Sequence, residues 1–268
     1  MGKMVRRRVT VTTLEGGSSG RDGSAAATAA AQAATDGAMA DIYALLVGVR
    51  TANKAVQLGA QLNEDAAGRA EADRKNERPD EVLSVHVADV IQETVSICRA
   101  LSVEKFGVAP DIEVDLVGDA AGCRVIGFSD HVHFPVMEVL KNSVFAMVER
   151  WGSASVEDAD PILLSVSSND THCGVRVSDL GGGLPSHVER SKLFAFYGTT
   201  VPPREATYTY SRQFGVPFNG LGVGAPVARL YARSMGGDLT VCSLPGAGCD
   251  TVISFDMFGK QPVFQRLA

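Results

Sequence analysis

Two polar side chains interrupt an apolar helical pattern near the middle of the chain. Glu138 and Asn142 stand four residues apart within VMEVLKNSVFAMVERW, residues 136–151, and residues at this spacing share one face of a helix. The carbonyl oxygen of an Asn can coordinate magnesium, and a carboxylate one turn earlier can orient or deprotonate an attacking hydroxyl group. An exposed polar stripe would have the same spacing, so the pair is a candidate for this chemistry and not proof of it.

A second motif, DLGGG at residues 179–183, follows a predicted strand. The carboxylate of Asp179 can accept a hydrogen bond from the amino group of adenine, and the glycines allow the backbone to approach a flat base closely. An ordinary Asp-Gly turn at the end of a strand has the same sequence. The motif alone therefore indicates a nucleotide only weakly.

Two further glycine motifs lie nearer the C-terminus. GLGVGAP, residues 220–226, precedes a predicted helix with Pro226 in its first turn, where backbone N–H groups can bind phosphates. A dinucleotide-binding motif would need a strand directly before the glycines, and an irregular stretch stands there instead. GAGCD, residues 246–250, lies between two predicted strands and is equally compatible with a hairpin turn and with a nucleotide contact.

The elements that must position these motifs follow from hydrophobic periodicity. The pattern predicts helices over 83–107, 130–151, 186–197 and 225–237, and strands over 112–118, 123–129, 161–169, 173–179, 238–244 and 249–258. Gly107 is a helix stop and Asp130 a candidate N-cap. This order predicts an α/β fold, a two-layer sandwich whose mixed sheet is covered by helices on one face.

Composition limits the partners. The 268 residues are 45% hydrophobic, enough for one ordinary domain with appendages. The net charge of -6 argues against a protein that binds nucleic acid by neutralising phosphates, and no apolar run is long enough for a membrane span. The five cysteines are dispersed, without the paired spacing of a zinc site or of a disulfide framework.

The N-terminal region differs in composition from the rest. Residues 1–40 combine a basic start with a Gly, Ser and Ala tract, which predicts a disordered tail or a leader. The Arg-rich start is compatible with a mitochondrial leader, although Glu15 and Asp22 weaken that interpretation. Residues 41–78 contain a helical pattern to about residue 61 and then a charged connector.

Taken in order, EVLKNS, DLGGG, GLGVG and GAGCD resemble the GHKL ATPase superfamily. Within it, LKNSVFAMVER, VRVSDLGGGLP, GTT at residues 198–200 and GLGVGAPVARLYARSMGGDLTVCSLPGAGCD resemble the mitochondrial kinases of branched-chain 2-oxoacid dehydrogenase and pyruvate dehydrogenase. The resemblance implies a GHKL (histidine-kinase-like) ATP-binding kinase domain at 80–258, a remnant of an N-terminal helical domain at 41–78 and a C-terminal tail at 259–268.

The same resemblance assigns roles to single residues. Glu138 is implied as the general base toward a substrate serine, and Asn142 as the magnesium ligand. The implied nucleotide-binding residues are Asn142, Asp179, Gly181, Gly183, Thr199, Thr200, Gly220, Leu221, Gly222, Val223, Gly224 and Cys249. The implied cofactors are ATP and Mg2+, with K+ as a further ion.

Three positions depart from the family pattern. Phe134 replaces a His one turn before the catalytic Glu, while His133 points elsewhere around the helix; Phe145 replaces an Arg, and Cys249 replaces a Thr. A thiol is a weak hydrogen-bonding group, so reduced nucleotide affinity is expected. Residues 41–78 are also much shorter than the family's four-helix docking domain, which puts substrate targeting in question.

The leading hypothesis is an ATP-dependent protein serine kinase that phosphorylates and inactivates the E1 component of a mitochondrial 2-oxoacid dehydrogenase complex. The segment EKFGVAPDIEV, residues 104–114, slightly favours the branched-chain type over the pyruvate type. Expected partners are the E1 subunit, the lipoyl-bearing E2 core and a second copy of the chain, in the mitochondrial matrix, with no nucleic acid or membrane. The alternative is a catalytically weak nucleotide-binding regulatory module. A bacterial-type histidine kinase is disfavoured because Val87, not an acid, follows His86.

Overall fold

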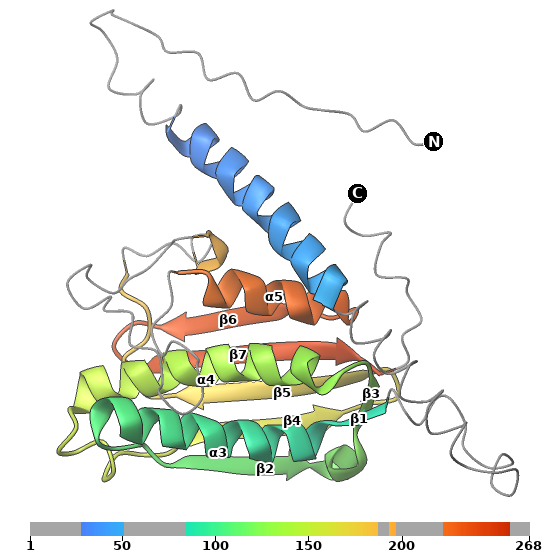
Figure 1. Ribbon diagram of the computed structural model, residues 1–268. Coiled ribbons are helices and arrows are strands. Elements are labelled where there is room, and N and C mark those ends of the chain that lie inside the picture. Colours follow the sequence, from blue (N-terminus) through green and yellow to red (C-terminus); the bar gives the residue numbers. More distant parts are fainter. Residues whose placement is uncertain (1–27, 51–83, 187–192, 197–221, 258–268) are drawn as a thin grey trace, which may run out of the picture.

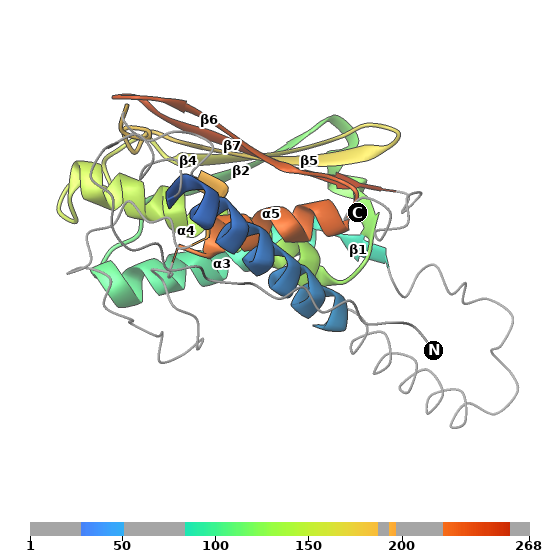
Figure 2. The same ribbon diagram turned by 90° about the horizontal axis from the view of Figure 1, so that it is seen from above.

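A five-stranded mixed sheet covered by helices on one face forms the body of the molecule (Figures 1 and 2). The computed structural model describes residues 28–50, 84–186, 193–196 and 222–257. The strand order is β2-β4-β5-β7-β6, that is Ile112–Val117, Ile162–Ser168, His172–Asp179, Gly248–Asp256 and Leu239–Leu244. Only the β2–β4 pair is parallel. Helices α3 (Val87–Phe106), α4 (Ser129–Trp151) and α5 (Gly224–Ser234) cover the sheet. The predicted α/β two-layer sandwich is confirmed.

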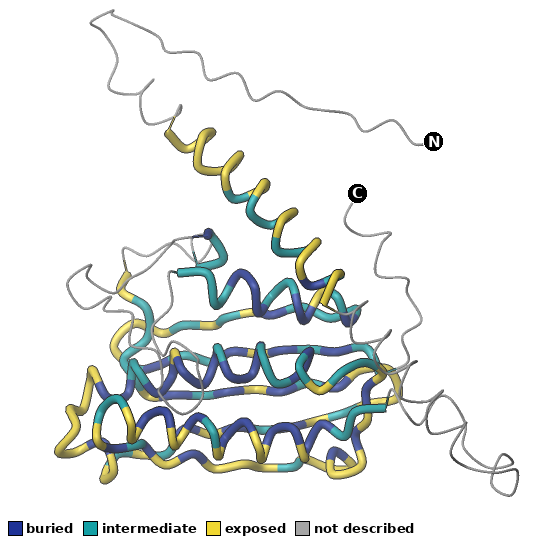
Figure 3. Tube along the Cα trace, in the orientation of Figure 1, coloured by how far each residue is buried: buried dark blue, intermediate teal, exposed yellow. Residues whose placement is uncertain are grey.

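Burial alternates along the central strands, as expected for a sheet with one covered face. On β4, Ile162, Leu164 and Val166 are fully buried, whereas Leu163 is 47% exposed. The buried positions pack against the inner face of α4, where Val136, Leu140, Val144 and Met147 are completely shielded from solvent. Figure 3 shows the same pattern as buried segments on the strands beneath the helices. The core therefore lies between the sheet and the three helices.

The structure has the predicted end of α3 and the predicted turn between β4 and β5, but not the predicted N-cap of α4. Helix α3 ends at Gly107, whose φ of 77° suits glycine, and the β4–β5 hairpin turns where Asn169 accepts the backbone N–H groups of Thr171 and His172. Asp130 does not cap α4, because the N-cap residue is Phe128 and Asp130 lies inside the first turn. A carboxylate there still interacts favourably with the helix dipole.

Other predicted elements differ in their bounds and partners. The helix predicted from residue 83 begins at Val87, because Ser84–His86 form a short strand, β1. Strand β1 pairs with β3 (Arg124–Ile126) in a separate two-stranded sheet, and the short helix η1 (Gly118–Gly122) separates β3 from β2. The strand predicted to residue 129 is shorter because Ser129 opens α4. Of the helix predicted over 186–197, residues 193–194 form a single 3-10 turn and 187–192 and 197 lie outside the described residues.

Residues 28–50 form a helix that crosses the boundary at residue 40 suggested by composition. Segment 28–40 was expected to lack structure, but it is rich in alanine, the strongest helix former. The helix packs beside α5 in a second apolar cluster of Val47, Phe196, Val227 and Tyr231. Along the described helices, none has the length and hydropathy required to cross a bilayer.

The one-sided cover of the sheet can be tested with neighbouring leucines on β4. We expect Leu164→Ala to lower the free energy of unfolding by about 2–5 kcal/mol, because it leaves a cavity under α4. Leu163→Ala, on the uncovered face, should change it by only about 0.5 kcal/mol. Urea denaturation of both variants measures the difference, and equal losses would contradict this assignment of faces.

Candidate nucleotide site

Glu138 lies where α4 meets the start of α5. Its side chain is 12% exposed, and the ammonium group of Lys141, 3% exposed, donates a hydrogen bond to Oε1. The other carboxylate oxygen, Oε2, lies against Gly224, so closely that a Cβ atom at that position would overlap it. The acid in the apolar helix is thus compensated by a buried cation and points at a helix N-terminus, where negative charge is favourable.

Asn142 occupies the same face of α4, one turn further on. Glu138, one turn before it, contacts Gly224, and Ala146, one turn after it, contacts Gly181. Its position between these two contacts directs Asn142 toward the gap between the α5 start and the DLGGG loop. The residue is exposed, whereas Glu138 on the same face is largely buried. Lys141 is the buried polar neighbour instead, and an exposed amide oxygen is free to bind a hard cation.

Asp179 ends β5 and is 7% exposed. The hydroxyl group of Ser143 on α4 donates to Oδ2 at 2.8 Å, and the backbone N–H of Gly181 donates to Oδ1 at 3.0 Å. Burial raises the pKa of Asp179, and these hydrogen bonds together with one from the Cys249 backbone oppose the rise. The carboxyl group is therefore held in one orientation by donors from both α4 and its own loop.

The DLGGG loop and the GAGCD turn form one interlocked unit. Gly246 donates its N–H to the carbonyl oxygen of Gly182 at 2.7 Å, and Gly182 donates to that of Ala247 at 3.2 Å. Any larger residue at Gly183, whose φ is 70°, would overlap the carbonyl oxygen of Leu244, and one at Gly181 would overlap Ala146. The predicted turn and the predicted base-binding loop are thus neighbours in space.

Cys249 lies directly opposite Asp179 in the β5–β7 register. The half-buried thiol contacts the hydroxyl group of Ser243, which also accepts the N–H of Leu184 at 2.7 Å. Burial raises the pKa of the Cys249 thiol, and the nearby Asp179 carboxylate raises it further. Cys249 therefore stays protonated beside Asp179, as a weaker hydrogen-bonding group than a hydroxyl.

The start of α5 has no side-chain cap. Gly222 has a φ of 72°, Val223 is the N-cap residue without a side-chain cap hydrogen bond, and the first turn carries no acidic residue. Such a helix start favours an anion such as phosphate. Of the other residues predicted to contact phosphate, Thr199, Thr200, Gly220 and Leu221 lie outside the described residues.

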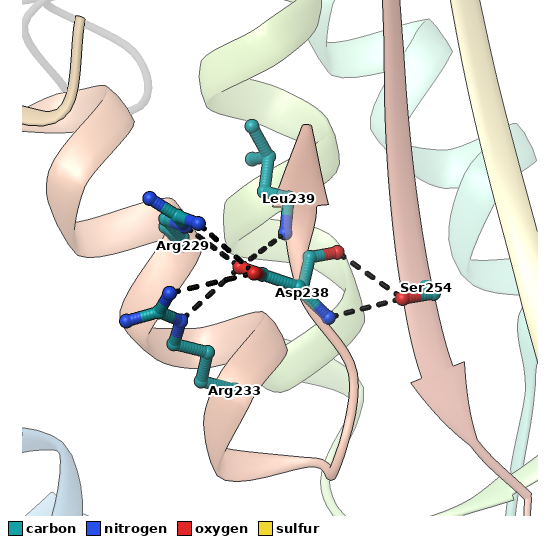
Figure 4. Close-up of polar contacts among 5 residues, drawn as sticks. All are labelled: Arg229, Arg233, Asp238, Leu239 and Ser254. Atoms are coloured by element: carbon teal, nitrogen blue, oxygen red, sulfur yellow. Dashed lines mark hydrogen bonds and ion pairs between the residues drawn. The ribbon is translucent and has the colours of Figure 1, made fainter. Parts of the chain in front are cut away.

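An ion cluster fixes α5 to the sheet at the other end of the helix (Figure 4). Arg229 donates two hydrogen bonds to Asp238, at 2.7 and 3.0 Å, and Arg233 donates two more. Asp238 also accepts the N–H of Leu239, and its own N–H binds the hydroxyl group of Ser254 on β7. Burial alone would raise the pKa of Asp238, but the hydrogen bonds from both guanidinium groups outweigh it and hold the pKa well below its usual range.

This cluster was not among the predicted site residues. Its charged residues, Arg229, Arg233 and Asp238, lie within ARLYARSMGGDL, a segment that contributed to the resemblance. Two arginines four apart on a helix, followed by an Asp at the start of the next strand, are the pattern that could have revealed it.

Residues of α4 where the chain departs from the family pattern make contacts with neighbouring helices. His133 points to α3, where its Nδ1 lies 2.8 Å from the hydroxyl oxygen of Thr94, so it is directed away from Glu138 as expected. Phe134 packs on Tyr231 of α5 with ring centres 4.8 Å apart, and Phe145 packs near Phe106 of α3 at 6.4 Å. Both aromatic rings therefore serve contacts between helices.

A hollow in the described part of the chain borders the DLGGG and GAGCD motifs but no residue of α4 or α5. It measures about 600 Å³, and its lining includes the predicted site residues Asp179 and Cys249 together with Leu163, Arg176 and Leu244 of the strands. Glu138, Asn142 and Gly222 do not line it. The candidate site is therefore defined by the convergence of side chains between α4, α5 and the ends of β5 and β7, on the helix side.

Residues 129–258 match the family described as histidine kinase-, DNA gyrase B-, and HSP90-like ATPase. This match agrees with the GHKL (histidine-kinase-like) ATPase fold predicted from the motifs. The chain is 31% identical over 191 residues to human pyruvate dehydrogenase (acetyl-transferring) kinase isozyme 3, mitochondrial. The aligned region covers 68% of this chain and 46% of that relative. Human isozyme 1 is 32% identical over 192 residues, 68% of this chain and 42% of the relative.

The corresponding mitochondrial kinase of Drosophila melanogaster is 28% identical over 189 residues, 67% of this chain and 45% of the relative. The GHKL domain thus resembles mitochondrial pyruvate dehydrogenase kinases, as the motifs indicated. The chain spans less than half the length of these relatives. Their names give no support to the branched-chain preference drawn from residues 104–114.

The anchoring of α5 by Asp238 predicts that the free energy of unfolding depends on pH. Since the pKa of Asp238 is lower in the folded protein than the value of about 3.9 expected in the unfolded chain, its contribution to stability is fully present above the unfolded value. It is lost progressively as the pH falls from the unfolded value through the lower pKa of the folded protein. We expect Asp238→Asn to lower the free energy of unfolding at pH 7 by about 1 kcal/mol, since the carboxylate is one-third exposed and screened.

This loss should shrink as the pH falls below about 4. Urea denaturation between pH 3 and pH 8 measures the difference between Asp238→Asn and the unmodified protein. Asp111→Asn is the control, because that side chain is 77% exposed and 4.0 Å from its partner Arg99. A loss for Asp238→Asn that is independent of pH would contradict the role of the ionised carboxylate.

Proposed function

We propose that this protein is an ATP-dependent protein serine kinase of the 2-oxoacid dehydrogenase kinase type. The observation that carries the proposal is the contact between the carboxylate of Glu138 and Gly224. This contact supports the proposal, because a general base at this helix start would lie beside the terminal phosphates of a nucleotide bound there. The similarity to mitochondrial pyruvate dehydrogenase kinases supports the reaction type.

The adenine end of ATP would lie at Asp179, whose carboxyl group faces the loop formed by Gly181 and Gly183. Both carboxyl oxygens already receive a donor from the protein, and each has capacity for a further one. The phosphates would lie at the start of α5, against Gly222, Val223 and Gly224. By the family resemblance, Thr199, Thr200, Gly220 and Leu221 would complete the phosphate contacts, and Cys249 would border the base.

Asn142 fits a magnesium ligand. Its side chain is exposed on the face of α4 that also carries Glu138 and Ala146, and amide oxygens together with substrate phosphates are ligands that magnesium accepts. When bound, the ion would neutralise charge on the phosphates. A role for K+ is proposed from the family resemblance only.

Glu138 would act on the substrate hydroxyl. As the serine oxygen bonds to the γ-phosphorus and the bond to the β-phosphate oxygen breaks, the serine proton passes to the carboxylate and ADP leaves. Lys141 holds the carboxylate through Oε1 and so leaves Oε2, the oxygen beside Gly224, as the acceptor. The backbone N–H groups at the start of α5 would stabilise the transferring phosphoryl group.

The E1 component of a 2-oxoacid dehydrogenase complex is the proposed substrate, in the mitochondrial matrix. Because the relatives named above are pyruvate dehydrogenase kinases, pyruvate dehydrogenase is the first E1 to test. The lipoyl-bearing E2 core and a second copy of the chain are further proposed partners, on the family resemblance alone.

The metal role of Asn142 predicts a loss of nucleotide binding. At a concentration of magnesium ATP about 100 times the dissociation constant, binding should stabilise the unmodified protein by about 2.7 kcal/mol. Asn142→Ala should lose most of this gain while its stability without ligand stays the same, because the side chain is exposed. Thermal denaturation of both proteins with and without magnesium ATP measures this stabilisation.

Gln92→Ala, which removes an exposed amide from α3, should retain the full shift and is the matched control. An unmodified protein without any nucleotide-dependent shift would refute the proposed function itself.

The general-base role predicts a separation of binding from transfer. Glu138→Gln should bind magnesium ATP but transfer phosphate to E1 about 10²–10⁴ times more slowly, because an amide cannot accept the serine proton. Glu93→Gln, an exposed acid on α3, should leave the rate unchanged. Radiolabel transfer from ATP to purified pyruvate dehydrogenase E1 measures the rates. An unmodified protein that binds ATP but labels no E1 would instead be a nucleotide-binding module.

A further inference from the structure

Arg150 lies at the C-terminal end of α4 and connects that helix to both irregular segments beside Asp179. Its Nη1 donates to the carbonyl oxygen of Leu180 at 2.8 Å and to that of Ala247 at 2.6 Å. Leu180 follows Asp179 directly in the chain, and Ala247 ends the turn that leads into Gly248 and β7. One side chain thus reaches both segments that border the carboxyl group of Asp179.

These segments lie beyond the end of β5 and before the start of β7, so strand pairing does not hold them. They are joined to each other by the two backbone hydrogen bonds between Gly182 and the turn at residues 246–247. Arg150 adds the link from this unit to α4. The stem of the side chain also covers Gly182, where a Cβ atom would lie 3.7 Å from its Cδ, and the guanidinium group lies 5.2 Å from the ring centre of Trp151. Its orientation is therefore fixed by packing on two sides.

Arginine suits this position for a geometric reason. A guanidinium group has five donors in a rigid plane, so it can bind two carbonyl oxygens at a fixed separation. A lysine has a compact ammonium group on a flexible stem and would hold the two segments less firmly. The hydrogen bonds of Arg150 to Leu180 and Ala247 go to neutral carbonyl groups, so its removal leaves no buried carboxylate without a partner.

We propose that Arg150 is a positioning residue for the base-binding end of the nucleotide site. It holds the Asp179 loop at a fixed distance from α4, the helix that carries Ser143 and Asn142, and thereby sets the affinity for the adenine ring. This inference rests on the proposed function, since it takes adenine as the group bound at Asp179. Arg150 itself touches neither the phosphates nor the substrate hydroxyl.

The test compares adenosine, which has no phosphates, with magnesium ATP, which would also bind at the start of α5. Arg150→Ala should weaken adenosine, measured by competition against a fluorescent ATP analogue, and magnesium ATP by the same factor, about tenfold to a hundredfold, as for a misplaced binding group. The KM for ATP should rise while kcat stays constant, because binding is lost equally in the ground state and the transition state. Arg150→Lys should retain part of the affinity.

Arg124→Ala is the matched control. Arg124 is also exposed and also binds a backbone carbonyl oxygen, that of Ser84, but it lies in the small β1–β3 sheet. Its removal should leave both affinities unchanged. Wild-type affinity in Arg150→Ala, or a lower melting temperature of the ligand-free protein without a change in adenosine affinity, would overturn the inference and leave the proposed function standing. Should Arg150→Ala fail to fold, Arg150→Lys is judged by the same criteria. An unmodified protein that binds neither ligand would overturn both.

Discussion

Close approach at three glycines brings the segments of the candidate site together beside α4. Gly181 meets Ala146, Gly224 meets the carboxylate of Glu138, and Gly248 meets the carbonyl oxygen of Asp179. At Gly181 and Gly248 a Cβ atom would overlap the backbone of its neighbour, so even alanine would force the backbone to move, whereas at Gly224 the end of the Glu138 side chain would be displaced. The α5 start, the DLGGG loop and the closing hairpin are all brought to the same side of one helix by the lack of three side chains. The polar groups of α4 can therefore face all three at once.

The polar groups at this junction are held individually, and each by a different kind of partner. Glu138 has a buried ammonium group, Asp179 has a hydroxyl and a backbone N–H, and Asp238 has two guanidinium groups. The buried Glu138–Lys141 pair contributes little net stability, because desolvation offsets the attraction, and the partly exposed Asp238 cluster is screened by solvent. What they provide is a fixed orientation of each carboxyl group. Fixed charges that need no reorganisation are what positioning for phosphoryl transfer requires.

The sequence predicted the layers of the fold and the residues of the junction, but not how buried those residues are. Strict alternation on β4 and β5 and the Asn169 turn define a hairpin locally, so those predictions needed no tertiary information. The partner of β3 could not be predicted, because a three-residue strand carries no signal for the distant β1. Likewise, helical spacing puts Lys141 and Asn142 side by side, and only the packing of α3 and α5 around α4 decides that Lys141 is buried and Asn142 exposed.

The same packing explains how the site tolerates Phe134. The resemblance leads to a hydrogen-bonding His at this position, one turn before Glu138, and Phe134 offers only its ring. That ring packs on Tyr231, which also contacts His131 and belongs to the apolar cluster shared with residues 28–50. The contact joins the first half of α4 to α5, on the stretch that leads to Glu138. Orientation of the carboxylate then depends on Lys141 from its own helix and on the fixed distance between α4 and α5, which aromatic packing maintains without a polar partner.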